Sequence, residues 1–557
     1  MQEQYDVVVV GSGAAGMMAA LRAHDRGLRV LVIEKAHKFG GTSATSGGII
    51  WLANSGGPAS DDSREESFKY LNAIQGEGAR PEKISAFIDA GRTVRSYLET
   101  LGLIGTPAHI PDYFAEMVGS RADRSLLFPR FDGWRLGERF VHMREQFTRF
   151  KLLNRYAMTV PESFAISTQA KGWMPSLARI IAGYWLDVRT RGRTRRDRWL
   201  TLGGSLIGPL YLQMINRGIE VRLSTRLTGF TREAGRITGV EVQSHGPGYV
   251  IGASRGVIAC AGGFEWNQEL RDKYLRVPTQ INWCNTPEFA NTGDALCAAA
   301  VLDADTEFTQ DNWWVPTMLM PIASASNYLE THQAFFDVGR PHSLCVNRFG
   351  HRFTNEAQSY DRFGNAMADD HVATGANLPC WLIFDARFRR KYTVGGLMPA
   401  MLMPDRRIPN DWWDQFIFRS DTILGLAHKI GLPAETLERT VHTMNGYAQT
   451  GVDAEFGRGS SDFERSTGYS GAGPNPCLGA IDKAPFYAVP IYLGDIGSKG
   501  GLKTDESARV LNRQGHPIPG LWAAGNASGN PFGNCYPGAG GTLGPALTFG
   551  YIAGDNV

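Results

Sequence analysis

The sequence predicts an α/β fold, and three features near the N-terminus lead to that prediction. Four consecutive valines, Val7 to Val10, form the pattern of a buried strand. The strand runs directly into Gly11-Ser-Gly13-Ala-Ala-Gly16 and an alanine-rich helical stretch. A second strand pattern, Leu28 to Ile33, ends on Glu34, 18 residues after Gly16. This order of strand, glycine turn, helix, strand and acid predicts a Rossmann-like dinucleotide-binding unit.

The glycine turn has a physical reason for each of its three glycines. The first makes the tight turn, the second lets the backbone approach a pyrophosphate, and the third lets the helix pack on the strand. The phosphates are expected at the helix N-terminus, beside Ala14 and Ala15, where free N–H groups and the helix dipole favour negative charge. Glu34, followed by Lys35, is placed to accept hydrogen bonds from ribose hydroxyls.

Composition excludes several classes of protein. The chain has 557 residues, 43% of them hydrophobic and 20% charged, with 57 Lys+Arg against 55 Asp+Glu. That balance favours a globular protein over a disordered one and argues against a nucleic-acid partner. The 7 cysteines are scattered without a Cys-x-x-Cys pair, so we expect reduced thiols and no metal site. Without a signal-peptide pattern or a long apolar run, the chain is expected to be cytoplasmic.

Three further segments resemble parts of the two-dinucleotide-binding flavoproteins. They are Gly40-Gly-Thr-Ser-Ala-Thr-Ser-Gly-Gly48, Val257-Ile-Ala-Cys-Ala-Gly-Gly263 and Gly520-Leu-Trp-Ala-Ala-Gly525-Asn. Any one of them alone could be an ordinary glycine-rich turn, but their order follows that of the family and implies FAD. The resemblance implies further FAD contacts from Gly41, Thr42, Ser43, Ser46, Gly47, Gly48, Ala261, Gly262, Gly525, Asn526, Gly541 and Leu543.

The order of these segments resembles the fumarate reductase/succinate dehydrogenase flavoprotein superfamily. That resemblance implies an FAD domain interrupted by an α+β capping catalytic domain. We expect the FAD domain at residues 1–283 and 487–557, and the cap at 284–486. Relatives that attach FAD covalently carry a histidine where this chain reads Gly41-Thr42-Ser43, so FAD is expected to be non-covalent.

The expected cap departs from fumarate reductases at a decisive position. Arg352-Phe-Thr-Asn-Glu356 matches their segment, but the arginine that should follow four residues later is Tyr360 here. The stretch from Asn534 to Thr542 carries no cation either. A dicarboxylate would be left unpaired in a buried site, which is costly, so a fumarate reductase-like activity is the least favoured alternative.

The remaining motifs resemble the 3-ketosteroid dehydrogenases, most of all the Δ1 enzymes. The C-terminal block begins at Tyr536-Pro-Gly-Ala-Gly540-Gly-Thr-Leu-Gly-Pro, and Pro111-Asp-Tyr113 resembles the active-site stretch near the family's N-terminus. The second match is looser, because the family's Gly-Gly-Arg reads Gly119-Ser-Arg121 here.

The resemblance implies a reaction and a role for four residues. A proton leaves C2 of a 3-ketosteroid and a hydride leaves C1 for flavin N5, as a step in steroid degradation. Tyr536 and the amide of Gly540 would hold the C3 oxygen, Tyr360 would be the base, and Tyr113 its hydrogen-bond partner. The alternatives are a Δ4-dehydrogenase on the same scaffold and a flavin-bearing electron carrier without steroid chemistry.

Six apolar residues allow two structural interpretations. Trp313, Trp314, Met318, Met320, Phe335 and Phe336 are candidates either for an apolar steroid cleft or for ordinary cap core.

Basic residues gather between residues 135 and 198. This segment has 14 Lys/Arg against 5 Asp/Glu, and a helix-length apolar stretch, Trp173 to Val188, stands before six closely spaced arginines. Aromatic helix ends and an arginine cluster are typical of a helix at a membrane surface. A buried helix followed by a solvated basic turn would have the same sequence pattern. If the segment contacts a membrane, the steroid could enter from the lipid and a quinone could accept the electrons.

Overall fold

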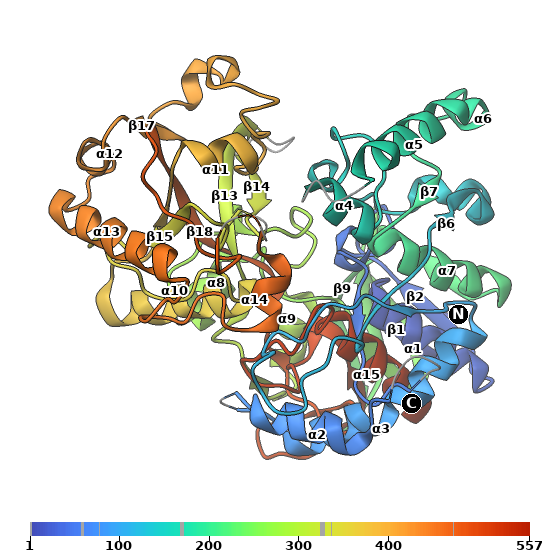
Figure 1. The fold of residues 1–557 in the computed structure, drawn as a ribbon. Helices are drawn as coiled ribbons and strands as arrows, with labels where there is room; N and C mark the ends of the chain where they lie inside the picture. The colour runs from blue at the N-terminus through green and yellow to red at the C-terminus, as the bar shows by residue number, and fades with distance from the viewer. Residues whose placement is uncertain are drawn as a thin grey trace.

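The computed structural model describes residues 3–56, 61–76, 78–167, 172–323, 329–335, 337–469, 471 and 473–557. Figure 1 shows a lower body around β1 and β2, a second lobe around β13 and β18, and an arm that carries α4, α5 and α6. Among the described residues no helix is both long and apolar enough to cross a membrane.

The lower body is built on a sheet whose central strands are parallel. Its main path is β20 (Arg509–Leu511), β21 (Pro517–Ala523), β11 (Tyr249–Ala259), β1 (Glu3–Val10), β2 (Val30–Ile33) and β8 (Glu220–Arg222). The hairpin β9 (Arg226–Glu233) and β10 (Arg236–Gln243) extends from β11. Strand β1 pairs in parallel with β2 on one side and β11 on the other, so a crevice is expected at its carboxyl end.

Helices cover this sheet. Helix α1 (Ala14–Asp25) follows β1 directly, and its buried face contacts α15 (Leu543–Asn556) and α7 (Gly203–Asn216). Helix α3 (Pro81–Thr100) packs on α15 and on α2 (Arg64–Ala73). The chain's last helix is therefore held beside its first, which places the C-terminal glycine block at the end of β1.

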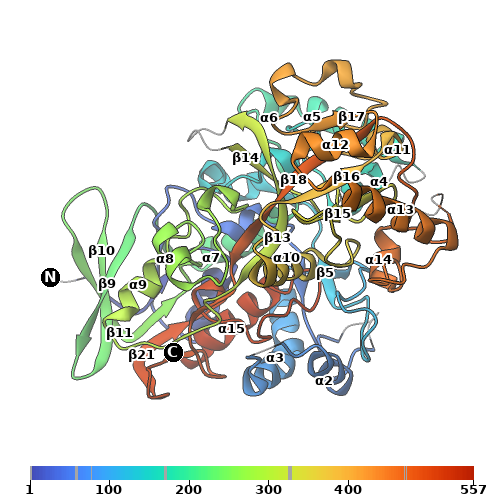
Figure 2. The same cartoon turned by 90° about the vertical axis from the view of Figure 1, so that its left-hand side faces the viewer.

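The second lobe is an antiparallel sheet covered by helices. Its order is β14 (Leu329–Gln333), β13 (Asn312–Ala323), β18 (Phe486–Ser498), β16 (Cys380–Phe384) and β15 (Ser343–Val346), with β17 (Phe418–Ser420) also on β18. The helices of this lobe are α10 (Tyr360–Thr374), α11 (Ala386–Lys391), α12 (Ile423–Ile430), α13 (Ala434–Thr450) and α14 (Asp462–Thr467). Figure 2 shows β18 running from this lobe toward the lower body.

Strand β18 determines where the second lobe ends in the sequence. The expected cap ended at residue 486, which is the first residue of β18. Because β18 pairs with β13 and β16 over its length, we propose that the second lobe continues to Ser498.

The arm leaves and rejoins the body at one place. Strand β6 (Phe131–Asp132) pairs with β7 (Trp199–Leu200), and the arm lies between them. It holds the 3₁₀ helices η2 (Gly133–His142) and η3 (Thr148–Phe150), then α4 (Val160–Ser167), α5 (Trp173–Leu186) and α6 (Val188–Arg191). Helix α5 occupies the stretch expected to be helical, while residues 168–171 of the basic segment lie outside the described part of the chain.

Short elements complete the described structure. They are β3 (Ile50–Trp51), β4 (Thr106–Pro107), β5 (Ser125–Leu127), β12 (Thr306–Glu307), β19 (Gly501–Leu502), α8 (Gln268–Tyr274), α9 (Asp294–Ala300), and the 3₁₀ turns η1 (Thr42–Thr45), η4 (Ile281–Trp283), η5 (Asp405–Arg407), η6 (Asn410–Trp412) and η7 (Gly525–Ala527).

Candidate active site

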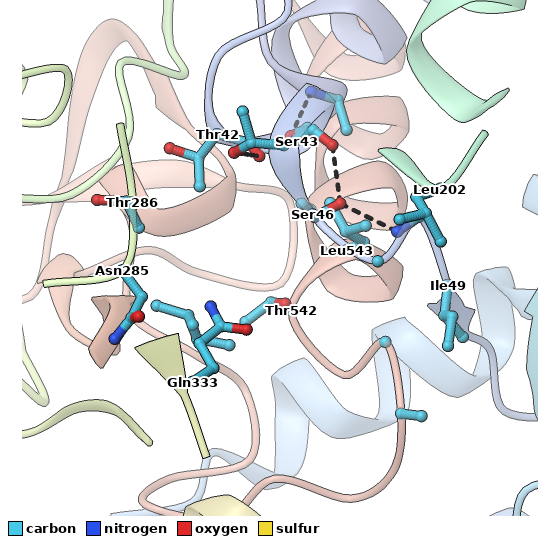
Figure 3. Close-up of a pocket in the computed structure, with 18 of the residues that line it drawn as sticks. Thr42, Ser43, Ser46, Ile49, Leu202, Asn285, Thr286, Gln333, Thr542 and Leu543 are labelled. Carbon is cyan, nitrogen blue, oxygen red and sulfur yellow. Dashed lines mark hydrogen bonds between the residues drawn. The ribbon is translucent and has the colours of Figure 1, made fainter. Parts of the chain in front are cut away.

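A cavity of about 880 Å³ lies at the carboxyl end of β1, between the lower body, the second lobe and the arm. Figure 3 shows Thr42, Ser43 and Ser46 on one side of it and Asn285, Thr286 and Gln333 on another. The Ser46 hydroxyl donates to the Ser43 carbonyl at 2.7 Å, which fixes this glycine-rich turn against the cavity (Figure 3). All three parts of the molecule therefore contribute to one site.

The first glycine turn has the shape that a dinucleotide needs. Gly11 has φ of +106°, and a Cβ there would lie 2.2 Å from the Cys260 carbonyl oxygen. A Cβ on Gly16 would lie 2.0 Å from the Gly11 oxygen, so this glycine permits helix packing and does not line the cavity. The N-cap residue of α1, Gly13, has no side chain to cap the helix, and the Ala14 N–H donates to the Ser43 hydroxyl at 3.1 Å. The N–H groups that follow in the first turn are left for an anionic group. The turn fits the diphosphate of FAD.

Hydrogen bonds fix the orientation of the Glu34 carboxylate at the end of β2. Its Oε2 accepts from the Ser12 hydroxyl at 2.6 Å and from the Ser12 N–H at 3.1 Å, and its Oε1 accepts from the Ala36 N–H at 2.9 Å. Glu34 lines the cavity, so its carboxylate fits the ribose role expected from sequence. The neighbouring Lys35 also lines it, but its ammonium is paired with Asp294 at 2.9 Å.

The structure brings most of the expected cofactor residues into the cavity wall. Those that line it are Gly11, Gly13, Ala14, Ala15, Glu34, Lys35, Gly41, Thr42, Ser43, Ser46, Gly47, Gly48, Ala261, Gly262, Gly525, Asn526 and Leu543. Gly16 does not, and Gly541 lines a smaller neighbouring cavity of about 20 Å³.

Sequence reasoning missed a polar group on the far wall. Asn285, Thr286 and Asn291 line the cavity, and the Asn291 amide donates to the Thr42 hydroxyl at 2.8 Å. The same amide donates to Glu265 at 2.5 Å. The signal was the Asn-Thr-Gly-Asp run from Asn291 to Asp294, a turn that leads into α9 through Gly293 at φ +78°.

Three tyrosines meet at the other end of the cavity. The ring centroids of Tyr113, Tyr360 and Tyr536 lie 5.4–5.6 Å apart in each pair. All three line the cavity, as does Gly540. Tyr360 starts α10, Tyr536 lies in the loop before α15, and the Tyr113 N–H donates to the Pro537 carbonyl at 3.0 Å. Residues from three distant parts of the sequence thus form one cluster.

The three tyrosine side chains influence one another electrostatically. Tyr360 interacts with both Tyr113 and Tyr536, and the Tyr536 hydroxyl lies 3.2 Å from the Thr542 hydroxyl. Burial raises the pKa of Tyr113 and of Tyr360 well above its ordinary range, and it also raises the pKa of Tyr536. A free tyrosinate is therefore unfavourable here. Transfer of a proton from one tyrosine hydroxyl to the next costs less than loss of a proton that leaves a single tyrosine charged.

Gly540 contributes a backbone donor to the wall of the same cavity. It has φ of +97°, and a Cβ there would lie 2.6 Å from the Ile49 carbonyl oxygen. The Gly540 carbonyl accepts from the Trp51 N–H at 3.1 Å, whereas its own N–H donates no hydrogen bond within the described chain. A phenol and a free N–H that line the same cavity can hold an oxygen that gains negative charge.

Of the apolar candidates, Phe335 lines the cavity and packs on Tyr360 with ring centroids 4.6 Å apart. Trp313 packs edge-on against Tyr536 at 4.9 Å and lines the smaller neighbouring cavity. Trp314, Met318 and Met320 are buried in the core of the second lobe. Phe336 lies outside the described residues.

The arm supplies part of the cavity wall. Met158, Val160, Pro161, Ser163 and Phe164 line it, and Phe164 is 41% exposed. An apolar wall of this kind suits a lipophilic ligand.

The comparisons with known proteins agree with this geometry. A family model described as an FAD binding domain matches residues 6–543. The 3-oxosteroid 1-dehydrogenase of Mycolicibacterium smegmatis is 37% identical, over 99% of this chain and 96% of that protein. A crystal structure of 3-ketosteroid delta1-dehydrogenase from Sterolibacterium denitrificans, in complex with 1,4-androstadiene-3,17-dione, is 39% identical with a TM-score of 0.94 and 99% coverage of both chains. The 3-ketosteroid-delta4-(5alpha)-dehydrogenase of Rhodococcus jostii is 21% identical with a TM-score of 0.65, covering 100% of this chain and 96% of that one, and shares the fold.

Proposed function

This chain belongs to the 3-oxosteroid 1-dehydrogenases, a family of FAD-dependent oxidoreductases, and on that premise we propose that its cavity introduces the C1–C2 double bond into ring A of 3-ketosteroids. The observation that carries the proposal is the convergence of Tyr113, Tyr360, Tyr536 and the free N–H of Gly540 in one apolar cavity that continues into the FAD cradle. FAD is bound without a covalent link in this proposal, since the Gly41-Thr42-Ser43 turn offers no histidine.

The first role of the chain is to polarise the substrate ketone. The Tyr536 hydroxyl and the Gly540 N–H donate to the C3 oxygen and stabilise the negative charge that grows there as C2 loses its proton. Both donors are fixed before the substrate arrives, because the loop 536–541 is anchored to the rest of the body. Tyr113 N–H and Tyr70 hydroxyl both donate to the Pro537 carbonyl, at 3.0 Å and 2.5 Å. Preformed donors of this kind are typically the largest contribution to catalysis.

The second role is to take the C2 proton. Tyr360 accepts it as base while its own hydroxyl proton passes to Tyr113, and Tyr113 in turn releases its hydroxyl proton to solvent through the cavity, so that neither phenol is left charged in the buried site. When bound, FAD supplies the acceptor for the C1 hydride. Phe335, which lines the cavity and packs on Tyr360, provides an apolar wall beside these steps.

The Δ4 alternative needs the same ketone clamp with the substrate displaced by one ring position. We favour Δ1 because two mycobacterial relatives of that name are 36–37% identical over 99% of this chain. The similarity to the Δ4 enzyme, at 21% identity, supports the fold alone.

The activity is tested by mixing the purified yellow protein anaerobically with androst-4-ene-3,17-dione and following the flavin absorbance. Bleaching with formation of the 1,4-diene, identified by mass spectrometry, is the expected result. Bleaching only with the ring-saturated 3-ketosteroid would show Δ4 chemistry, and no bleaching with either steroid would refute the steroid assignment.

We also propose that the arm rests on a membrane surface, with a membrane quinone as electron acceptor. Apolar side chains project from it: Met174 is 62% exposed, Trp185 52%, Leu186 78% and Val188 74%. Arg189, Arg193 and Arg195 are exposed beside them, as an anionic lipid surface requires. The same arm lines the substrate cavity, which offers a lipophilic steroid a path from the lipid.

Only half of the arginine cluster is exposed for that contact. Arg191 stacks over the Tyr184 ring at 3.6 Å, Arg196 donates to the Phe140 carbonyl at 2.6 Å, and Arg198 pairs with Asp132 at 2.8 Å. The basic charge of the sequence therefore overstates the charge that faces outward.

Vesicle flotation tests the membrane contact. The double variant Trp185→Ser/Leu186→Ser is expected to lose binding to anionic vesicles and turnover with a quinone embedded in them. Val301→Ser, which removes an exposed apolar residue at the end of α9 in the lower body, should bind normally. Equal flotation of both variants would refute the contact.

A further inference from the structure

A buried ion pair lies behind the tyrosine cluster. Lys499 Nζ lies 3.4 Å from Asp361 Oδ1, and neither side chain is more than 2% exposed. Lys499 follows the last residue of β18, and Asp361 lies in the first turn of α10, directly after Tyr360. Desolvating buried charges is costly, so a buried ion pair adds little to the stability of the fold. Its position behind the tyrosines therefore suggests a functional role.

Lys499 is linked to Tyr536 by two contacts. Its ammonium donates to the Asn534 carbonyl at 2.7 Å, two residues before Tyr536. It also lies 5.0 Å from the centroid of the Trp313 ring, and Trp313 in turn packs edge-on against Tyr536. The cation is therefore separated from the Tyr536 ring by one indole.

Asp361 is linked to Tyr360 through the chain itself. Its Oδ2 accepts from the Asn365 amide at 3.0 Å, which holds the carboxylate against the start of α10. Besides Lys499, no cation lies within 4 Å of this carboxylate in the described chain. Burial raises the pKa of Asp361 to about 6, with Lys499 acting in the opposite direction. The charge of Asp361 in turn adds to the rise in pKa of Tyr113 and Tyr536.

We infer that Asp361 and Lys499 are positioning residues whose opposite charges set how readily the tyrosine cluster gives up a proton during the proposed reaction. Neither touches the cavity of the substrate; each acts through its neighbours, Asp361 through Tyr360 and Lys499 through Trp313 and the Tyr536 loop. The pair is close to neutral as a whole, so removing either member leaves the other as a net charge beside the hydroxyls. This inference rests on the proposed function, because it assigns a role within that reaction.

Other charged groups near the pair are already matched. Asp311, whose carbonyl accepts from the Lys499 N–H at 3.2 Å, is paired with Arg276 at 2.8 Å. Arg362, the residue after Asp361, pairs with Glu116 at 2.8 Å. The remaining titratable neighbour is the Cys535 thiol, whose pKa burial raises to about 11, so it is neutral in the working range. The uncompensated charge in each variant thus comes from the pair itself.

The experiment compares the pH dependence of kcat/KM in two single variants. Asp361→Asn leaves a positive charge, which favours loss of a tyrosine proton, and is expected to lower the apparent pKa of the rising limb by about one unit. Lys499→Met leaves a negative charge and is expected to raise it by about one unit at pH values where Asp361 is ionised. The double variant should return toward the wild-type midpoint.

Three controls keep the result interpretable. Lys499→Arg retains the charge and should retain the midpoint even where kcat falls. Lys503→Met removes a surface lysine paired with Asp305 at 2.8 Å and should change nothing. Tyrosinate absorbance in the ultraviolet, read as a difference against the same variants in a Tyr360→Phe background, reports the tyrosine titration without any steroid turnover.

The possible outcomes separate this inference from the proposed function. If the wild type does not oxidise 3-ketosteroids, the proposed function fails, and the absorbance titration still decides whether the pair tunes the tyrosines. Changes in kcat or KM without a shift of the midpoint in either single variant would overturn the inference and leave the pair a purely structural tie.

Discussion

The hydroxyl of Tyr536 shows how much of the site depends on single atoms. It lies 3.2 Å from the Thr542 hydroxyl, and this hydrogen bond fixes its direction before substrate binds. The neighbouring free N–H of Gly540 requires a residue without a side chain, because a Cβ would meet the Ile49 oxygen at 2.6 Å.

Replacing Tyr536 with phenylalanine removes one of the two proposed oxyanion donors. We expect kcat to fall by about 10²–10³ with a smaller change in KM, because the lost interaction is strongest in the transition state. Steady-state kinetics with androst-4-ene-3,17-dione provide the measurement. Tyr551→Phe is a matched control, since Tyr551 lies on α15 against Tyr97, and a similar loss in that variant would argue against a specific role for Tyr536.

Some of these residues could be predicted from the sequence and some could not. Tyr360 and Tyr536 were found because each lies in a local motif that resembles a known family. Asp361 and Lys499 carry no such signal, because their pairing depends on β18 reaching the start of α10 in the folded molecule. Trp313 and Trp314 were equal candidates for the steroid cleft in the sequence. Because side chains alternate along β13, the Trp314 ring lies in the core of the second lobe and the Trp313 ring lies against Tyr536.

At the scale of elements, the turn from β1 into α1 is the feature most tightly determined by local chemistry. Gly11 combines a positive φ with a close approach to the Cys260 carbonyl, and Gly16 packs against Gly11. The sequence predicted this turn correctly because each requirement acts over a few residues.

Gly11→Ala should therefore abolish FAD binding. The added methyl would meet the Cys260 oxygen at 2.2 Å, which forces the loop after β11 away from the cofactor. We expect a colourless protein whose FAD dissociation constant, measured by quenching of flavin fluorescence, is raised by at least about 10². Gly27→Ala tests the specificity of that result, because Gly27 also has a positive φ, of +85°, but no heavy atom lies within 4 Å of its added Cβ. Retention of yellow colour in the Gly11 variant would contradict this account.

The arm shows the limit of prediction at this scale. The helical stretch of α5 was predicted correctly from its apolar run. The inward direction of Arg191, Arg196 and Arg198 could not be predicted, because their partners lie on other turns and loops brought close by folding. The end of the second lobe could not be predicted for the same reason. The sequence of β18 has the pattern of a buried strand, but it does not show which strands β18 pairs with.

At the scale of the whole molecule, Glu265 lies where the two lobes meet. It follows β11 of the lower body and faces Asp495 of β18, and its side chain is fully buried. Burial, with a further contribution from the charge of Asp495, raises its pKa to about 7. The Asn291 amide joins this carboxyl to Thr42 in the cofactor cradle.

Glu265 makes the stability of the molecule depend on pH in a definite direction. Between its ordinary pKa of 4.5 and the raised pKa of about 7, the folded protein binds more protons than the unfolded chain. The free energy of unfolding should therefore fall as pH rises through this window, by about 3 kcal/mol from this group. Glu265→Gln should remove that part of the slope in denaturant unfolding followed at several pH values.

A matched variant identifies the source of that slope. Glu269→Gln alters an exposed carboxyl on α8, four residues along the chain, and should leave the pH dependence unchanged. A slope that persists in the Glu265 variant would show that other groups control it.

In the proposed function, one cavity clamps a 3-ketone and directs oxidation to C1–C2. A single-turnover reaction with 5α-androstane-3,17-dione distinguishes this from Δ4 chemistry, because that steroid is saturated at both C1–C2 and C4–C5. The protein is mixed anaerobically with one equivalent, and the product is identified by nuclear magnetic resonance once the flavin has bleached. We expect the 1-ene; a 4-ene, or a flavin that stays oxidised, would refute Δ1 chemistry in this cavity.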